Sequence, residues 1–312
     1  MIRAIQVKNW KAYHADDIRN FPMTRPAAAI GQPIVWLVYN SASGSYVDGL
    51  ADEIASRLSG ADLNLARSFD CQSETLPDAD MASAAGVETV IVHGGDGTLN
   101  AMVSDLIGWE GAVLPLPGGT ANLLCHKLFE QCDWEAVLDS FLEGKLASRR
   151  LEVVRCGDHI ALAETLAGPA ALWADAREEI RQREAAGILA ASKDAIIQSA
   201  EGPFVYVVDP PIGSDNGYPG IRFTPENGAF RIQGYLQENF LDFLRQGLAI
   251  LSHDFRQGPH DDLGTSTRVV CRAHDDSRIE LMFDGERASV ASGAEFLFDT
   301  LHVNVLAGKA ES

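Results

Sequence analysis

The chain has 312 residues, of which 46% are hydrophobic and 22% are charged, a composition typical of a folded globular protein. Its 44 acidic and 25 basic residues give a formal net charge of −19 at pH 7. This charge argues against electrostatic binding of nucleic acid and against simple adsorption on an anionic membrane, because both need clustered lysine and arginine. An anionic ligand must instead be held by helix N-termini, a metal ion or single basic residues.

Cysteine use and the N-terminus indicate the broad class of protein. The five cysteines are an odd number without a Cys-x-x-Cys pair, so we interpret them as reduced thiols of a cytoplasmic protein. No uninterrupted apolar run of about 18 residues is present, so we expect no transmembrane helix. Residues 1–30 lack the apolar core of a signal peptide and show no clear period, which is typical of a loosely held extension.

Strands and amphipathic helices alternate over residues 31–150. Continuous apolar runs predict buried strands at 33–39, 87–93 and 112–116. Each is followed by a loop and by apolar residues at helical spacing. These helix residues are Val47, Leu50, Ile54 and Leu58, then Leu99, Met102, Val103 and Leu106, and finally Leu124 and Leu128. The alternation predicts an α/β domain with a parallel sheet.

The pattern changes at residue 151. A long charged helix is expected over 173–200, and short strands separated by turn signals follow it. Asn227-Gly228 is a strong hairpin turn. Strands are expected at 204–208, 221–223, 230–235, 269–272, 279–283 and 294–298. We therefore expect a second, mostly antiparallel domain over 151–300, and a last strand at 301–306 that either closes it or returns to the first domain.

Three polar loops follow the three strands of the first domain, at residues 40–45 (NSASGS), 94–98 (GGDGT) and 117–122 (PGGTAN). In open α/β sheets, ligands bind outside the carboxyl ends of the strands. Glycines let backbone N–H groups approach phosphate oxygens closely, and a helix N-terminus adds a favourable dipole. One such turn is often purely structural, but three in register favour a phosphate site.

Asp96 is unexpected among these phosphate-type loops. A carboxylate beside phosphates is repelled unless it holds Mg²⁺ or takes a proton from the attacking hydroxyl. No G-x-x-x-x-G-K-[ST] sequence is present, so the site is not of the Walker type.

Four segments together resemble the diacylglycerol kinase catalytic-domain family. Residues 94–98 resemble the GGDGT signature that this family shares with sphingosine kinases and NAD kinases. Residues 40–44 resemble the family's N-P-x-S-G loop, 116–122 its P-x-G-T-x-N loop, and 283–286 its Asp-Gly-Glu motif. The resemblance extends over residues 33–306. It implies an α/β nucleotide domain, a mostly antiparallel β-sandwich domain, and an active site in the cleft between them.

The resemblance also implies roles for individual residues, with ATP and Mg²⁺ as cofactors. Glu286 is the favoured general base for the acceptor hydroxyl, with Asp96 as the competing candidate. Asp96 and Asn227 are the candidate metal ligands. The implied nucleotide-binding residues are Asn40, Ser43, Gly44, Gly94, Gly95, Asp96, Gly97, Thr98, Gly119, Thr120, Asn122, Asp284 and Gly285.

The chain departs from the family pattern at several places. Ser41 replaces a proline, Gly118 replaces a leucine or isoleucine, and Glu152 replaces an aspartate. Residues 225–228 (PENG) occupy the place of an Asp-Asp-Gly segment that organises a structural Mg²⁺ site. Residues 209–222 match no glycine-rich family pattern, so an unusual acceptor pocket is expected.

The resulting hypothesis is a kinase that phosphorylates the hydroxyl of diacylglycerol or a related lipid. The alternatives are an NAD-kinase-type enzyme and a non-catalytic nucleotide- or lipid-binding regulatory protein. A lipid acceptor requires transient membrane contact by a cytoplasmic protein. The sequence leaves open whether the protein forms a homodimer. The candidate residues for membrane contact are Arg149, Arg150, Arg155 and Trp173, and pairing of these arginines with acids is the competing interpretation.

Overall fold

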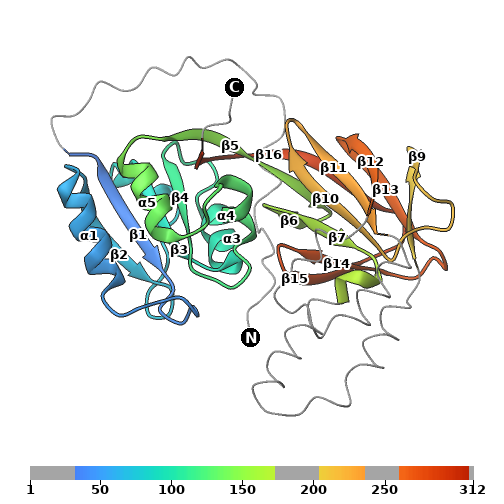
Figure 1. Ribbon diagram of the computed structural model, residues 1–312, viewed down its shortest axis with the longest axis horizontal. Coiled ribbons are helices and arrows are strands. Elements are labelled where there is room, and N and C mark those ends of the chain that lie inside the picture. Colours follow the sequence, from blue (N-terminus) through green and yellow to red (C-terminus); the bar gives the residue numbers. More distant parts are fainter. Residues whose placement is uncertain (1–31, 173–203, 236–259, 309–312) are drawn as a thin grey trace, which may run out of the picture. The chain divides into compact units, whose positions relative to one another are not determined.

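The computed structural model describes residues 32–172, 204–235 and 260–308. The chain divides into two compact units (Figure 1), unit 1 with Met1–Leu151 and His302–Ser312, and unit 2 with Glu152–Leu301. The N-terminal extension, the expected helix over 173–200 and Trp173 lie outside the described residues. Within those residues, no helix is both long and apolar enough to cross a membrane.

Unit 1 is built on a parallel sheet with the strand order β2-β1-β3-β4. The last part of β16 continues this sheet, because Asn304 pairs with Ala112 of β4 in parallel register. The last strand therefore returns to the first domain. The strands are β1 (Ile34–Tyr39), β2 (Asn64–Asp70), β3 (Thr89–Gly94), β4 (Ala112–Pro117) and β16 (Ala294–Gly308).

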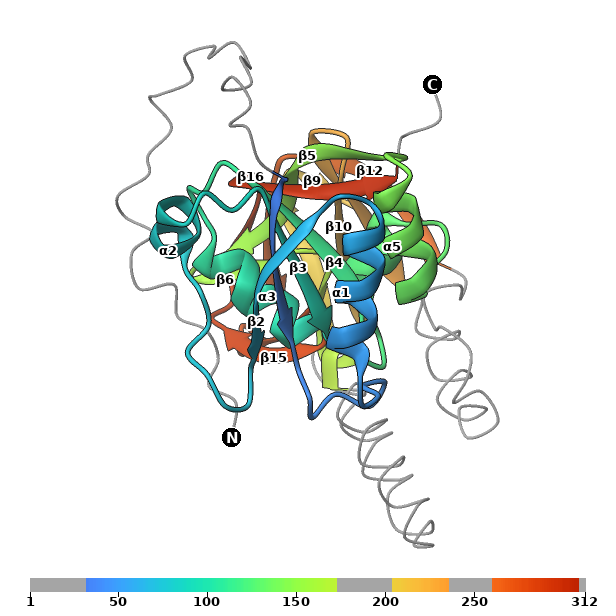
Figure 2. The ribbon, with the colours of Figure 1, turned by 90° about the vertical axis from the view of Figure 1, so that its left-hand side faces the viewer.

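Helices cover this sheet on both sides. In Figure 2, α1 and α5 lie to one side of the strands, and α2 and α3 to the other. The helices are α1 (Leu50–Gly60), α2 (Ala79–Ala84), α3 (Asp96–Asp105), α4 (Leu123–Leu128) and α5 (Trp134–Leu142). The arrangement confirms the expected α/β class. The sequence prediction missed β2, α2 and α5, so the strand expected as the second of the sheet is the third along the chain.

One expected helix position is wrong. Leu50, Ile54 and Leu58 are buried on α1, as their spacing predicts. Val47 lies before the helix and is 54% exposed. Gly49 is the N-cap of α1 and has a left-handed φ of 88°. The chain therefore turns between Val47 and Leu50, and Val47 does not continue the apolar face of the helix.

Unit 2 contains an antiparallel sheet with the order β12-β11-β10-β7-β14-β15. A second layer includes β8, β9, β13 and the first part of β16, with β5 and β6. These strands are β5 (Leu146–Cys156), β6 (His159–Ala161), β7 (Thr165–Ala167), β8 (Val205–Asp209), β9 (Pro211–Ile212), β10 (Gly220–Glu226), β11 (Ala229–Tyr235), β12 (His260–Ser266), β13 (Arg268–Ala273), β14 (Ile279–Phe283) and β15 (Glu286–Val290). A short 3₁₀ helix, Pro169–Leu172, follows β7.

The two layers enclose one hydrophobic core. Phe223 of β10 stacks on Phe296 of β16 with ring centroids 4.5 Å apart, and it meets Phe230 of β11 edge-on at 5.4 Å. All three rings are fully buried. This packing confirms the expected β-sandwich. The strands expected at 294–298 and 301–306 are one continuous strand, β16, which passes from unit 2 into unit 1.

The first prediction compares two apolar positions near the start of unit 1. Ile54→Ala should lower the free energy of unfolding by about 2–5 kcal/mol, because it removes a fully buried side chain from α1. Val47→Ala should change it by less than about 0.5 kcal/mol, because Val47 is exposed. Chemical denaturation of both variants measures the difference. Equal losses in the two variants would contradict the placement of Val47.

Candidate active site

The three polar loops of unit 1 leave the sheet from aligned residues. Tyr39 pairs with His93, and His93 pairs in turn with Leu116. The backbone N–H of Asn40 donates to the carbonyl of His93 at 3.1 Å, and that of Gly118 donates to the carbonyl of Gly94 at 3.0 Å. The loops after β1, β3 and β4 therefore start side by side at the carboxyl edge of the sheet, as their sequence predicts.

The loops after β3 and β4 lie in close contact. A Cβ atom on Gly119 would lie 2.5 Å from the Cα of Gly95, and one on Gly118 would lie 2.7 Å from the backbone nitrogen of Gly94. Neither distance leaves room for a side chain. A Cβ on Gly44 would meet nothing within 4 Å, so the glycine of the first loop faces open space instead. Backbone proximity is therefore the reason for glycine in the second and third loops.

Asn40 connects the first loop to the second. Its Nδ2 donates to Oγ1 of Thr98 at 3.3 Å, and its Oδ1 accepts from the backbone of Ala42 and from Nε2 of Gln72, both at 3.0 Å. Thr98, in the first turn of α3, thus bonds to the neighbouring loop, while Gly95 occupies the N-cap position. The amide of Asn40 fixes the spacing of the two loops.

Asp96 is the first residue of α3, and it is half-buried. The prediction that residues 94–98 form a loop is therefore wrong from Asp96 onward. Its Oδ1 accepts the backbone N–H of Leu124 at 3.3 Å, which connects the starts of α3 and α4. An acidic side chain in the first turn of a helix is stabilised by the helix dipole. The carboxylate therefore has a structural role at this position in addition to any catalytic one.

Asn122 folds the third loop back on itself. Its Oδ1 accepts from the backbone of Gly119 at 2.7 Å, and its Nδ2 donates to the carbonyl of the same residue at 2.9 Å. The residue adopts a left-handed φ of 49° as the N-cap of α4. Thr120, between these two residues, is exposed. The predicted binding residues of the three loops are therefore brought together at one edge of unit 1.

Asp70 is a residue of this edge that the sequence prediction missed. It ends β2, where it pairs with Tyr39 of β1. One carboxylate oxygen accepts the hydroxyl of Ser41 at 2.7 Å, and the other accepts the backbone N–H of Gln72 at 3.0 Å. These bonds lower the pKa of Asp70, and the bond from the backbone of Gln72 has the largest effect. The hydroxyl of Ser41, where the family has proline, thus anchors the first loop to β2.

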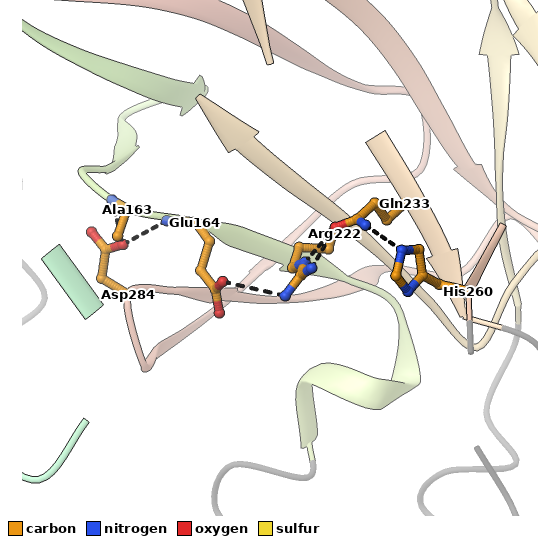
Figure 3. A network of polar contacts seen from close by, with 6 residues as sticks. All are labelled: Ala163, Glu164, Arg222, Gln233, His260 and Asp284. Carbon is orange, nitrogen blue, oxygen red and sulfur yellow. Dashed lines mark hydrogen bonds and ion pairs between the residues drawn. The ribbon is translucent and has the colours of Figure 1, made fainter. Parts of the chain in front are cut away.

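The Asp-Gly-Glu motif forms a tight turn in unit 2. Asp284 and Gly285 have φ angles of 47° and 91°, and Phe283 pairs directly with Glu286. The buried carboxylate of Asp284 accepts the backbone N–H groups of Leu162 at 2.6 Å and of Ala163 and Glu164 at 2.9 Å. Asp284 therefore holds segment 162–164 against the turn (Figure 3), and its nucleotide contact stays a prediction. Glu286 follows the turn with a half-buried side chain.

Segment 162–164 continues into a row of polar side chains across β10, β11 and β12 (Figure 3). Glu164 and Arg222 form an ion pair at 3.8 Å, and their side chains are only 11% and 12% exposed. Nε of Arg222 donates to Oε1 of Gln233 at 3.0 Å. The amide nitrogen of Gln233 therefore faces Nε2 of His260, and that ring nitrogen accepts the hydrogen bond. The sequence pattern gave no indication of this partly buried row.

Asn227, the second candidate metal ligand, lies in the two-residue turn between β10 and β11. It has a φ of 53°, and the next N–H group, that of Gly228, donates to Oε1 of Glu152 at 2.8 Å. In the described part of the chain, no three His, Cys, Asp or Glu side chains are grouped as a metal site. A single carboxylate, Asp96, suits Mg²⁺ that arrives with a nucleotide, since such ions are held largely by phosphates and water.

Two of the arginines proposed for membrane contact have acidic neighbours. Arg150 lies 3.9 Å from the carboxylate of Glu110 and bonds to the ring of His302, and Arg155 lies 3.5 Å from Asp299. Arg149 is exposed. For Arg150 and Arg155 these contacts favour the competing interpretation, in which they pair with acids.

Residues 34–156 match the sequence model of the diacylglycerol kinase catalytic domain. The resemblance inferred from the motifs is confirmed over these residues. The match contains β1, β3 and β4 with their three loops, and it ends with β5. Over these residues the chain is therefore similar to the catalytic domain of diacylglycerol kinases. No curated protein sequence matches the chain.

Three solved structures of proteins from Bacillus anthracis str. Sterne share the fold, and each is described, two of them provisionally, as a diacylglycerol kinase. The first is 14% identical, covering 91% of this chain and 100% of its own, with a TM-score of 0.54. The second is 12% identical, with coverages of 90% and 98% and a TM-score of 0.52. The third is 14% identical, with coverages of 89% and 99% and a TM-score of 0.53. At these identities the similarity shows the fold alone.

The second prediction concerns His93, which ends β3 and is fully buried. Burial lowers the pKa of His93 to about 4, below the value of about 6.5 in an unfolded chain. The unfolded state therefore binds the extra proton first, and stability is lost as the pH falls from about 6.5 to 4. The free energy of unfolding of wild type, relative to that of His93→Gln, should fall by about 3 kcal/mol over this range.

Urea denaturation at pH 7, 5.5 and 4.5 measures this effect. His126→Gln is the control, because His126 is exposed. This variant should show the same pH dependence of the free energy of unfolding as wild type. A constant difference between wild type and His93→Gln at all three pH values would show that His93 is not buried in the neutral form.

Proposed function

We propose that this protein transfers the γ-phosphate of ATP, with Mg²⁺, to the hydroxyl of diacylglycerol or a related lipid. The observation that carries the proposal is the alignment of three phosphate-type loops within the matched kinase domain. A lipid acceptor is the chemistry named for the family and for the three structures of similar fold. Such an acceptor resides in a bilayer, so transient membrane contact by the protein is part of the proposal.

The phosphates are assigned to the edge of unit 1. Backbone N–H groups of the glycine turns and the N-terminus of α3 are suitable donors for phosphate oxygens. The three loops contain no lysine or arginine, so the residues themselves neutralise little of the negative charge. Mg²⁺ supplies that neutralisation when it is bound with the nucleotide, and Asp96 is the residue that would hold it.

Transfer also requires a proton acceptor for the attacking alcohol. The oxygen of the acceptor hydroxyl bonds to the γ-phosphorus, the bond from that phosphorus to the bridging oxygen of ADP breaks, and the hydroxyl proton passes to a carboxylate. We assign this role to Glu286, because its side chain is half-buried and follows a tight two-residue turn. Asp96 is the alternative, although its carboxylate already accepts the backbone of Leu124.

An acceptor screen tests the function as a whole. ATP consumption is measured with diacylglycerol, monoacylglycerol, sphingosine and phosphatidylglycerol in neutral vesicles, and with NAD in solution. Turnover of a lipid alone supports the proposal. Turnover of NAD would make the protein an NAD-kinase-type enzyme, and binding of ATP without turnover of any acceptor would favour a regulatory role.

The third prediction tests the base. Glu286→Gln keeps the shape of the side chain and removes its basicity, so kcat should fall by about 10²–10⁴-fold while the affinity for ATP changes little. Glu280→Gln is the control, since Glu280 lies on the same hairpin in an ion pair with Arg287. If Glu286→Gln mainly weakens ATP binding, the residue contacts the nucleotide or its metal, and Asp96 becomes the better candidate for the base.

The fourth prediction separates the two roles of Asp96. Asp96→Asn retains an oxygen that can accept the N–H of Leu124, so the thermal midpoint should stay within a few degrees of wild type. Loss of the negative charge should still reduce turnover by at least about 10²-fold and raise the Mg²⁺ concentration needed for half-maximal rate. Wild-type turnover in this variant would remove Asp96 from the site.

A further inference from the structure

The carboxylate at the end of β2 is fixed in place and still has room for a ligand. Asp70 accepts three hydrogen bonds, from the hydroxyl and backbone of Ser41 and from the backbone of Gln72. Two carboxylate oxygens offer about four acceptor positions, so one position remains on the oxygen that binds only the Ser41 hydroxyl. The side chain is half-exposed at the same sheet edge as the phosphate-type loops.

An aromatic pair lies directly beside this carboxylate. Tyr39 ends β1 and pairs in register with Asp70. Its ring stacks on that of Tyr46 with centroids 5.7 Å apart and an interplanar angle of 11°. Burial, and then the charge of Asp70, raise the pKa of Tyr39. Half-buried aromatic faces at a ligand edge are suited to a flat organic group rather than to phosphate.

The strand order places these groups at a defined distance from the phosphate-type turns. Asp70 ends β2, and the Gly94–Gly97 turn follows β3, with β1 between the two strands. Two strand spacings amount to about 10 Å. This separation is of the order of that between the terminal phosphates and the ribose of a nucleoside triphosphate. Fixed acidic side chains at strand ends are also known acceptors for ribose hydroxyls in open α/β sheets.

We propose that Asp70 accepts the ribose hydroxyls of the bound nucleotide and thereby makes this site select ribonucleotides. The inference rests on the proposed function, since it requires a nucleotide whose phosphates occupy the glycine turns. A carboxylate here favours free hydroxyl groups and repels a phosphorylated ribose. It therefore distinguishes ATP both from deoxynucleotides and from nucleotides with a 2′-phosphate.

The competing explanation is that Asp70 only orders the first loop through Ser41. The two explanations differ in their effect on ligand choice. A residue that only orders the loop changes the affinity for all nucleotides by one common factor. A residue that binds the ribose changes the ratio between ATP and its deoxy analogues.

Calorimetric titration with ATP, 2′-deoxy-ATP and 3′-deoxy-ATP, all with Mg²⁺, measures this ratio without any acceptor. Wild type should bind ATP about 10- to 100-fold more tightly than at least one deoxy analogue, the range for one hydrogen bond to a charged group. Asp70→Ala should bind all three nucleotides within about threefold of one another. A retained melting temperature and retained binding of the deoxy analogues show that Asp70→Ala is folded.

Two control variants isolate the carboxylate. Ser41→Ala removes the loop anchor and keeps the charge, so it should keep the preference for ATP even if every affinity falls. Glu74→Gln removes a nearby exposed acid that pairs with Arg67, and it should leave all three affinities unchanged. Loss of the preference in Ser41→Ala as well would overturn the direct role of Asp70.

The remaining outcomes are also decisive. Equal binding of the three nucleotides by wild type would overturn the inference and leave the proposed function intact. Uniformly tighter binding by Asp70→Ala would show that the carboxylate faces the phosphates, which also overturns it. Failure of wild type to bind any nucleotide would overturn both the inference and the proposed function.

Discussion

The backbones of the turns after β3 and β4 lie so close together that no side chain fits between them, and the arrangement of the edge depends on this contact. A Cβ on Gly119 would come within 2.5 Å of Gly95. The contact fixes where α3 and α4 begin, and it brings Asp96 within reach of the first turn of α4. Any larger residue at Gly119 would force the two helix starts apart and displace the N–H groups that the turns present.

The same edge shows which features of the fold were predictable from the sequence. β1, β3 and β4 are buried on both faces, so they read as continuous apolar runs. β2 lies at the edge of the sheet and fully buries only Phe69, so it lacks the continuous apolar run that marks the other three strands. The turns at Asn227 and Asp284 were predictable because Asn-Gly and Asp-Gly pairs readily adopt the left-handed φ angles that a two-residue hairpin turn requires.

Site residues were predictable only where a short stretch of sequence determines the backbone conformation that their function requires. The glycine turns are of this kind. Asp70 is not, because its role arises from the parallel pairing of β1 with β2, which brings Ser41 to its carboxylate. Asp284 was recognised as part of a turn, but its carboxylate bonds to backbone about 120 residues earlier in the chain, and no local pattern encodes that contact.

The charge of the chain determines what the site can do. The net charge is −19 and the three phosphate-type loops contain no lysine or arginine, so on the proposed function these loops would contact the phosphates through dipoles and hydrogen bonds. Asp96 and Asp70 add two carboxylates to the same edge, each stabilised by its own donors. Uncomplexed triphosphate therefore meets net repulsion here, whereas the Mg²⁺ complex carries less charge and gives Asp96 a favourable partner. On the proposed function, selectivity for the metal complex would follow from the absence of basic residues in these three loops as much as from the two carboxylates.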